Sequence, residues 1–174
     1  MQDRRAPLVA AAATVVRVTA GLGQPPQVLA RKRAAATMLL TDAGGRVLVV
    51  KPTYKPRWEL PGGAVEAGES PGAAAAREIA EELGLRRVAG RLLAVDYVPA
   101  VSPRTEGLIV VFDGGTVEDP AALRLPADEL SDAAFVDPDG LDAYLPALQA
   151  RRARAALAAR DAGHAVYLED GRAA

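Results

Sequence analysis

Four charged side chains in the middle of the chain are spaced as they would be on one face of a helix. They are Arg77, Glu78, Glu81 and Glu82. At about 100° per residue, these positions fall within an arc of roughly 140°. Carboxylates at such spacings repel one another by roughly a few tenths of a kcal/mol per pair, and a hard divalent cation that prefers oxygen ligands relieves the repulsion. The spacing therefore indicates a site for Mg²⁺ or Mn²⁺, with a solvated acidic surface as the alternative.

The helix that carries these side chains has clear limits in the sequence. Ser70 offers a hydroxyl that caps free backbone N–H groups, and Pro71 is preset for a first helical turn. Residues 73–76 are alanines, which favour a helix, and Gly84 stands where a left-handed residue ends one. The opposite face is small and apolar and consists of Ala76, Ile79, Ala80 and Leu83. We therefore expect this face to pack closely against a sheet.

The acidic face belongs to a longer pattern of fixed positions. Five residues separate Gly63 from Glu69, and seven separate Glu69 from Arg77. Residues 63–85 as a whole resemble the Nudix box, the signature of hydrolases that cleave nucleoside diphosphates linked to another moiety. The match at Gly63, Glu69 and Gly84 weighs against a merely solvated acidic face. We count Arg77 with the catalytic residues because it would hold the glutamates in register, and Glu69 would hold Arg77.

The resemblance implies a metal site at the box. Glu78 and Glu82 are the expected principal ligands, and the backbone carbonyl at the position of Gly63 is a ligand in the family. Glu81 is a further ligand or the general base, since members of the family differ in which glutamate acts as the base. We therefore expect Gly63, Glu78, Glu81 and Glu82 at the metal, and Glu81 and Glu82 also in catalysis. The expected cofactor is Mg²⁺, with Mn²⁺ as a substitute.

One acidic residue outside the box is a further catalytic candidate. In several members of the family, an acidic residue lies six positions before an aromatic residue that opens a late strand. Glu129 stands six positions before Phe135 and is the candidate for an extra metal ligand or the general base. A solvated loop carboxylate is an equal alternative, and Glu106 and Asp96 are the other candidates.

Substrate contacts are expected just upstream of the box and on a later strand. Lys51 and Arg57 are placed to contact phosphate groups, while Trp58 and Tyr97 offer aromatic faces for stacking on a base. Packing at strand ends is the alternative for the two aromatic residues. The box predicts how a diphosphate is cleaved and leaves the identity of the substrate open.

The apolar runs predict the elements that must position these residues. Strands are expected at residues 35–41, 46–50, 58–60, 91–98, 107–112 and 165–168. Residues 139–160 predict one or two helices with a break near Pro146, and the arginines of residues 151–160 are expected to lie in solvent. The resemblance implies an α/β (α+β) fold, an α/β/α sandwich with a mixed central sheet in which the box forms a loop, a helix and a loop.

The expected domain organisation follows from these elements. Residues 1–30 would form an N-terminal extension, residues 31–145 the Nudix domain, and residues 146–174 a C-terminal helix and short arm packed on that domain. A secretory leader at the N terminus is disfavoured, because Asp3 and Arg17 bound the short apolar run there closely.

Composition limits the classes of function. The net charge of −1, without a long basic run, argues against a nucleic-acid track, and no apolar run approaches the ~18 residues of a membrane span. There is no cysteine, which excludes disulfides and cysteine metal sites, and the one histidine, His164, is expected on the surface. We therefore expect a cytoplasmic protein that acts on small molecules. Many members of the family are homodimers, so a homodimer is a further expectation.

Together these features predict a Mg²⁺-dependent pyrophosphohydrolase. Its substrate would be a nucleoside di- or triphosphate, or another nucleoside diphosphate derivative. The alternative is a catalytically silent domain of the same fold that binds a nucleotide for regulation. Such domains usually lose box glutamates, whereas this chain keeps all of them.

Overall fold

The centre of the molecule is a mixed β-sheet. In the computed structural model, which describes residues 30–174, eight strands belong to it. They are β1 (Arg33–Thr41), β2 (Val47–Pro52), β3 (Gly62–Ala64), β4 (Leu92–Val98), β5 (Gly107–Thr116), β6 (Leu130–Val136), β7 (Val166–Glu169) and β8 (Arg172–Ala173). The helices are α1 (Pro71–Leu83) and α2 (Ala147–Ala162), with the 3₁₀ helices η1 (Pro120–Ala122) and η2 (Pro138–Ala143). The expected N-terminal extension lies outside the described residues, apart from its last residue.

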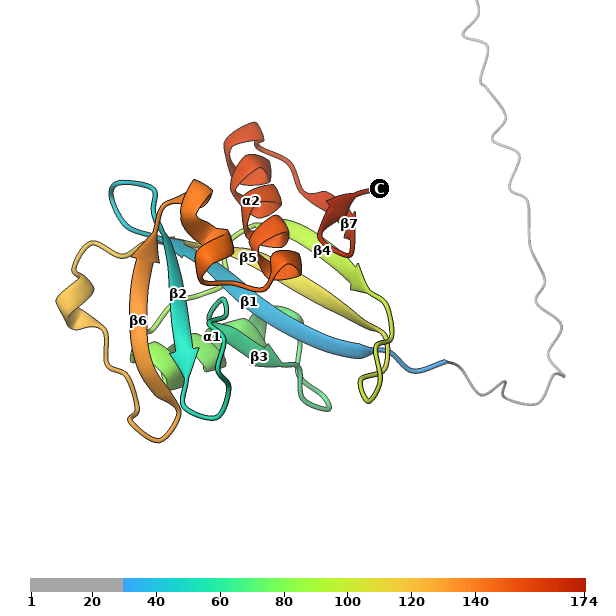
Figure 1. The fold of residues 1–174 in the computed structure, drawn as a ribbon, viewed down its shortest axis with the longest axis horizontal. Coiled ribbons are helices and arrows are strands. Elements are labelled where there is room, and N and C mark those ends of the chain that lie inside the picture. The colour runs from blue at the N-terminus through green and yellow to red at the C-terminus, as the bar shows by residue number, and fades with distance from the viewer. Residues whose placement is uncertain (1–29) are drawn as a thin grey trace, which may run out of the picture. The chain divides into compact units, whose positions relative to one another are not determined.

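The strand order places β1 in the middle of the sheet. The order is β6-β2-β1-β5-β4-β7-β8, and β3 pairs with β1 off this path. β1 runs parallel to β5 and antiparallel to β2 and β3. β4 is antiparallel to β5 and parallel to β7, so the C-terminal arm joins the same sheet (Figure 1). The expectation of a mixed central sheet is confirmed.

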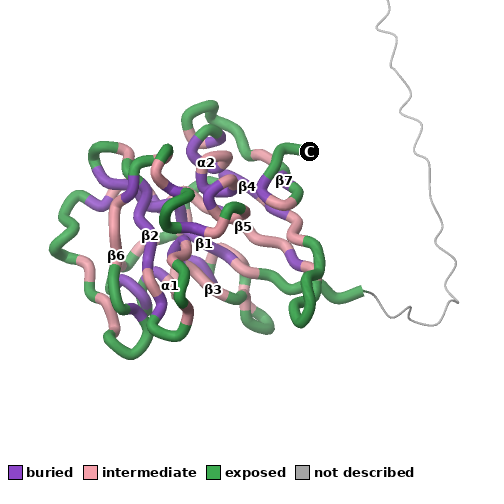
Figure 2. The backbone as a smooth tube through the Cα atoms, in the orientation of Figure 1, coloured by how far each residue is buried: buried purple, intermediate pink, exposed green. Residues whose placement is uncertain are grey.

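One helix covers each face of the sheet (Figure 1). Met38 and Leu40 of β1 pack in the cluster that contains Ile79 of α1. Leu39, between them, packs in the cluster that contains Leu157 of α2. Because successive strand residues point to opposite faces, β1 contributes to both cores, and its burial is visible in Figure 2. Burial of each of these β1 side chains stabilises the fold by about 1.5–3 kcal/mol. The expected α/β/α sandwich is therefore held together by these two apolar layers.

The limits of α1 agree with the sequence prediction. The Ser70 Oγ accepts a hydrogen bond from the Ala73 N–H at 3.2 Å, and Pro71 begins the helix. Gly84 ends it with a φ of 67°, and its N–H donates to the Ala80 carbonyl at 3.1 Å. Ala80 is exposed, which differs from the prediction that it packs with the apolar face. Both helix ends are thus set by local residues whose backbone and side-chain chemistry suits a cap.

The segment before β3 differs from the prediction of a strand at residues 58–60. Glu59 makes only an isolated bridge to Val50, and the strand that follows is β3, which begins three residues further on and pairs with β1. Pro61 has no N–H to donate to a ladder and interrupts the segment. Phe135 lies near the end of β6, so the prediction that it opens a strand was also wrong.

The C-terminal part follows the predicted break near Pro146. The segment before it is the 3₁₀ helix η2, and α2 begins directly after it. Gly163, with a φ of 81°, ends α2, and the chain then returns as β7 beside β4. His164 is exposed, as expected. Within residues 30–174, no helix is both long and apolar enough to cross a membrane.

A charged pair is buried between α2 and β4. Arg152 is 6% exposed and Asp96 is 0% exposed, so the prediction that the arginines of α2 lie in solvent was wrong for Arg152. The Arg152 Nε donates to the Asp96 Oδ2 at 2.7 Å, and the Gly171 N–H donates to the Asp96 Oδ1 at 3.0 Å. Asp96 therefore ties α2 and the turn between β7 and β8 to the sheet.

Candidate active site

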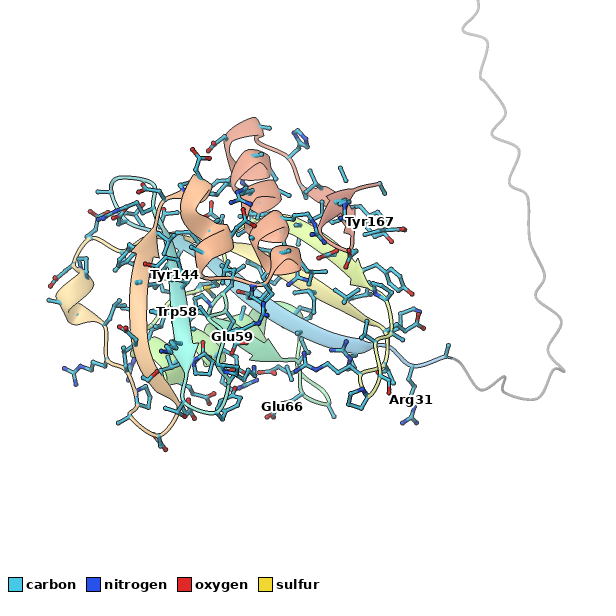
Figure 3. The ribbon with its side chains drawn as sticks, viewed as in Figure 1. Arg31, Trp58, Glu59, Glu66, Tyr144 and Tyr167 are labelled. Atoms are coloured by element: carbon cyan, nitrogen blue, oxygen red, sulfur yellow. The ribbon has the colours of Figure 1, made fainter. Side chains whose placement is uncertain are left out.

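A cavity of about 1220 Å³ opens beside β1 and β3. Its wall combines the start of the box with parts of the chain that are distant in sequence. The glutamates in the wall are Glu59, Glu78, Glu82 and Glu129, and Asp170 is a fifth acidic residue there. The wall also includes Gly62 and Gly63 from β3 and Leu148, Gln149 and Arg152 from α2. Figure 3 labels Glu59, which lies two residues before Pro61, the first residue of the Pro-Gly-Gly turn.

Glu82 is the buried carboxylate of the cavity. It is 9% exposed, and its Oε2 accepts a hydrogen bond from the Gly62 N–H at 2.9 Å. Burial raises the pKa of Glu82 to about 8; the Gly62 N–H opposes this shift, and the charges of Glu78, Glu59 and Glu129 add to it. Four carboxylates therefore act on one another here, and a cation would relieve their repulsion.

The Glu78 carboxylate packs against the backbone of β3 at Gly63, which has no side chain. Its pKa is raised, first by burial, while Arg77 opposes the shift and Glu81 and Glu129 add to it. A Cβ atom built on Gly63 would lie 2.3 Å from the Glu78 Oε1. The absence of a side chain at position 63 therefore leaves the room that this carboxylate occupies.

Arg77 holds the box together as a fork. Its Nε and Nη2 donate to the two carboxylate oxygens of Glu69, each at 3.1 Å. Its Nη1 donates to Glu78 and to Glu81, each at 2.9 Å, and Nη2 also donates to the Ala64 carbonyl at 3.1 Å. These bonds lower the pKa of Glu69 and raise that of Arg77. These contacts are the ones expected if Arg77 holds the glutamates in register, and the catalytic role of Arg77 stays a prediction.

The three glutamates of α1 do not all face the cavity. Glu78 and Glu82 line it, whereas Glu81 is paired with Arg77 and its side chain is 53% exposed. Among residues 30–174, no three acidic or histidine side chains form a ready-made metal cage. Mg²⁺ is usually bound by one or two carboxylates together with substrate phosphates and water, rather than by a cage of protein ligands. Glu78 and Glu82 beside Gly63 fit that mode of binding.

Of the three candidates for an acid outside the box, Glu129 is the one in the cavity wall. Glu106 accepts a hydrogen bond from the Tyr97 hydroxyl at 2.6 Å and pairs with Lys32 at 2.5 Å. Asp96 is held by Arg152. The structure therefore brings Glu129 towards the box, whereas Glu106 and Asp96 lie outside the cavity lining and are held by hydrogen bonds and ion pairs.

The predicted substrate contacts lie outside the cavity lining. Neither Lys51 nor Arg57 belongs to it, and neither does Trp58 or Tyr97. The Trp58 ring packs edge-on against Tyr144, with ring centroids 5.2 Å apart and an interplanar angle of 77° (Figure 3). The role of these four residues in substrate binding stays a prediction.

Sequence reasoning missed several residues of the cavity wall, among them Glu59, Gln149 and Arg152. Glu59 is paired with the Lys55 ammonium at 2.9 Å and stands two residues before the Pro-Gly-Gly turn, and this nearness is the one local signal that pointed to it. Gln149 and Arg152 come from α2, more than sixty residues after the box. Nothing in their local sequence separates them from the other polar residues of that helix.

Comparison with known proteins assigns the fold to a family. A family model described as a NUDIX domain matches residues 31–159, which is more than half of the chain. The chain belongs to the Nudix family. The Gly-Gly turn, the Arg77 fork and the cavity-facing pair Glu78 and Glu82 are therefore parts of a Nudix box in its folded form.

Relatives of this Nudix protein match it over different lengths. Diphosphoinositol polyphosphate phosphohydrolase 2 of Rattus norvegicus is 44% identical over 66 residues, which is 37% of this chain and 37% of that protein. The MutT protein from Methanosarcina mazei Go1 is 22% identical, with a TM-score of 0.62 over 76% of this chain and 95% of that chain. An ADP-ribose pyrophosphatase from Streptococcus suis 89-1591 is 19% identical, with a TM-score of 0.60 over 80% of this chain and 99% of that chain. The two solved structures support the Nudix fold.

Replacement of Gly63 tests how the Nudix box positions Glu78. In Gly63→Ala, the new Cβ atom would lie 2.3 Å from the Glu78 Oε1, so the carboxylate has to move away. We expect kcat/KM to fall by roughly 10-fold or more, the effect of disturbing a residue that is expected to bind the metal. The melting temperature should change little, because the atom that must shift is the end of a flexible side chain.

Gly72→Ala is the matched control for this substitution. A Cβ atom there meets Ala89 and Phe112 only at 3.7 and 3.9 Å, which are ordinary contacts. Its kcat/KM should equal that of the wild type. Equal activity of Gly63→Ala and Gly72→Ala would contradict the proposed placement of Glu78.

Proposed function

We propose that this protein is a Mg²⁺-dependent hydrolase that cleaves a diphosphate linkage in a nucleoside di- or triphosphate or another nucleoside diphosphate derivative. The observation that carries the proposal is the convergence of Glu78 and Glu82 with Glu129 on one cavity beside Gly63. Membership of the Nudix family supports the same reaction. At least one product would carry a phosphate monoester.

The metal would be held where the cavity is most acidic. Glu78 and Glu82 are the proposed ligands, together with the Gly63 carbonyl, and Mn²⁺ would be able to replace Mg²⁺. A divalent cation there supplies neutralisation of charge on the phosphate oxygens and a lower pKa for the attacking water. Two supports hold the ligands in place: the Arg77 guanidinium for Glu78, and the Gly62 N–H for Glu82.

Two carboxylates, Glu129 and Glu81, are candidates for the general base. Glu129 lines the cavity; its backbone carbonyl accepts a hydrogen bond from the Thr53 hydroxyl at 3.3 Å, whereas its carboxylate accepts none within the described residues. Glu81 is held by Arg77 on the exposed side of α1. A base must reach the attacking water, so we propose Glu129 as the base and Glu81 as a residue that helps to position Arg77.

The substrate is proposed to be a nucleotide-type small molecule. The cavity of about 1220 Å³ is large enough for a nucleoside diphosphate with a second group attached, since typical ligand pockets have ~300–1,000 Å³. The relatives named above act on chemically diverse diphosphates, so the proposal names the linkage rather than one compound. We propose that the protein acts in the cytoplasm, without nucleic acid or membrane as partners, and the homodimer stays a proposal.

A panel of diphosphates tests this function. The panel contains nucleoside triphosphates, ADP-ribose, nucleotide sugars, dinucleoside polyphosphates and a diphosphoinositol polyphosphate, each assayed with Mg²⁺ for released phosphate or monophosphate. We expect turnover of at least one nucleotide-type member. Tight binding without product from any of them would favour the alternative, a catalytically silent nucleotide-binding module.

Removal of the metal should abolish turnover. Because the carboxylates alone cannot neutralise the phosphate oxygens, we expect EDTA to reduce the rate to background and added Mg²⁺ to restore it. The measurement is the initial rate on the best substrate of the panel before and after each addition. Unchanged turnover in EDTA would exclude the proposed mechanism.

A further inference from the structure

The wall that α2 contributes to the cavity carries hydrogen-bond donors. Gln149 and Arg152 stand one helical turn apart, and both line the cavity. The Leu60 N–H donates to the Gln149 Oε1 at 3.3 Å, so the acceptor of that amide is in use. Its NH₂ group is the part left for a ligand.

Arg152 offers a second donor, and the ion pair that it forms with Asp96 carries no net charge. Its Nε is bonded to Asp96, and both oxygens of Asp96 are occupied, one by Arg152 and one by the Gly171 N–H. Among residues 30–174, the buried Nη2 of Arg152 has no hydrogen-bond partner. Buried donors without a partner are rare in native proteins, which points to an acceptor that a ligand supplies.

Apolar side chains lie beside these donors. Ile109 is the cross-strand partner of Asp96, and Val98 follows two residues after Asp96, on the same face of β4. Both residues line the cavity, as does Leu148 at the start of α2. A flat ring with acceptors on one edge suits such a wall better than a fully hydrated group does.

We propose that this wall, the α2 subsite (Gln149, Arg152, Val98 and Ile109), binds the nucleobase of the substrate and selects bases with a carbonyl acceptor on their edge. Guanine presents O6 and N7 as acceptors, and uracil presents O4, whereas adenine and cytosine present an amino donor at the matching position. The donors of Gln149 and Arg152 would form hydrogen bonds with the carbonyl oxygen of guanine or uracil. With adenine or cytosine they would face an amino group, which is itself a donor. The inference rests on the proposed nucleotide-type substrate and adds its base.

A phosphate group is a poorer match for the α2 subsite. The Arg152 charge is balanced by Asp96, and Asp170, whose carboxylate pairs with Arg151, also lines the cavity. Of the other cations in the wall, Lys32 is paired with Glu106 and Lys55 with Glu59, while Arg33 and Arg104 belong to β1 and to the loop after β4 rather than to α2. The donors at Gln149 and Arg152 therefore suit a neutral carbonyl oxygen.

Binding of nucleoside monophosphates to the full chain in EDTA tests the subsite without hydrolysis. Isothermal titration with GMP, IMP, UMP, AMP and CMP should give dissociation constants at least about fivefold lower for GMP, IMP and UMP than for AMP and CMP. Because no metal or turnover is involved, this result stands or falls separately from the proposed reaction. Equal binding of all five compounds, or no binding of any at millimolar concentration, would overturn the inference.

Gln149→Glu is the sharpest variant. It keeps an acceptor for the Leu60 N–H and replaces the NH₂ donor by a second acceptor. The GMP to AMP affinity ratio, in which general charge effects cancel, should fall by about fivefold or reverse. An unchanged ratio would overturn the assignment of Gln149.

Arg152 is tested by neutralising both partners together. The double variant Asp96→Asn with Arg152→Gln leaves no lone buried charge and should lose the preference for carbonyl bases while it still unfolds cooperatively. Arg154→Gln is the control, because Arg154 pairs with Asp142 and lies outside the cavity lining. Retention of the full GMP preference in the folded double variant would overturn the role of Arg152, and if that variant fails to fold, Gln149→Glu decides.

Discussion

Glu82→Gln should lower turnover by roughly 100-fold or more and at the same time stabilise the metal-free protein. The loss of activity follows because a proposed metal ligand loses its charge, and disturbing even a residue that supports a ligand costs about 10–100-fold. The gain in stability follows because Glu82 is buried beside three other carboxylates. Glutamine has nearly the same shape and can still accept the hydrogen bond from the Gly62 N–H.

The pH dependence of stability separates this account from a simple loss of structure. Burial, with help from Glu78, Glu59 and Glu129 and against the Gly62 N–H, raises the pKa of Glu82 from 4.5 to about 8 in the folded state. The folded protein therefore keeps a proton that the unfolded chain releases above its own pKa. Stability from this group is fully present below pH 4.5 and is lost as the pH rises through about 8.

Denaturant unfolding in EDTA at pH 5 and pH 8.5 measures this effect. The wild type should lose on the order of a few kcal/mol between the two pH values, and Glu82→Gln should lose clearly less. Added Mg²⁺ should restore the stability of the wild type more than that of the variant. A variant that is fully active, or that is less stable than the wild type at pH 8.5 in EDTA, would contradict the account.

Arg152→Met should destabilise the fold by about 3–5 kcal/mol, the usual cost of leaving one partner of a buried ion pair alone. Asp96 is 0% exposed, and without Arg152 it would keep only the hydrogen bond from the Gly171 N–H. Methionine fills much of the same space, so the loss reports the unpaired charge rather than a cavity. The measurement is the free energy of unfolding from denaturant titration.

Two comparisons define what this loss means. Asp96→Asn with Arg152→Gln should recover most of the stability, since neither residue then carries a buried charge. Arg154→Met, on the same helix, removes an exposed pair with Asp142 and should cost less than about 1 kcal/mol. Losses of equal size in Arg152→Met and Arg154→Met would show that the pair with Asp96 is not the anchor of α2.

The box helix was predictable because its signals are local. Ser70 and Gly84 act on backbone groups within a turn of themselves, so a sequence pattern contains the whole argument for both ends of α1. The Arg77 fork is similar, since Glu69, Glu78 and Glu81 lie within a few turns of it. Neighbouring residues in the chain decide these contacts, and tertiary packing changes them little.

The rest of the cavity was not predictable, because packing between distant segments creates it. α2 lies over β4, and this brings Arg152 to Asp96 and Gln149 to the Leu60 N–H. No periodicity distinguishes Arg152 from Arg151 or Arg154 on the same helix. The exposed Glu81 is a related case, since the spacing of the glutamates shows a shared face without showing which of them turns towards the sheet.

Hydrolysis in H₂¹⁸O tests the central claim most directly. The wild type is incubated with Mg²⁺ and the best nucleotide-type substrate, and the products are weighed by mass spectrometry, with Glu82→Gln and an EDTA sample in parallel. The account predicts that one phosphate monoester product carries a single ¹⁸O atom, and that this product is nearly absent in both parallel samples. A substrate that binds the wild type tightly and is recovered intact and unlabelled would contradict the claim that these carboxylates form a hydrolytic site.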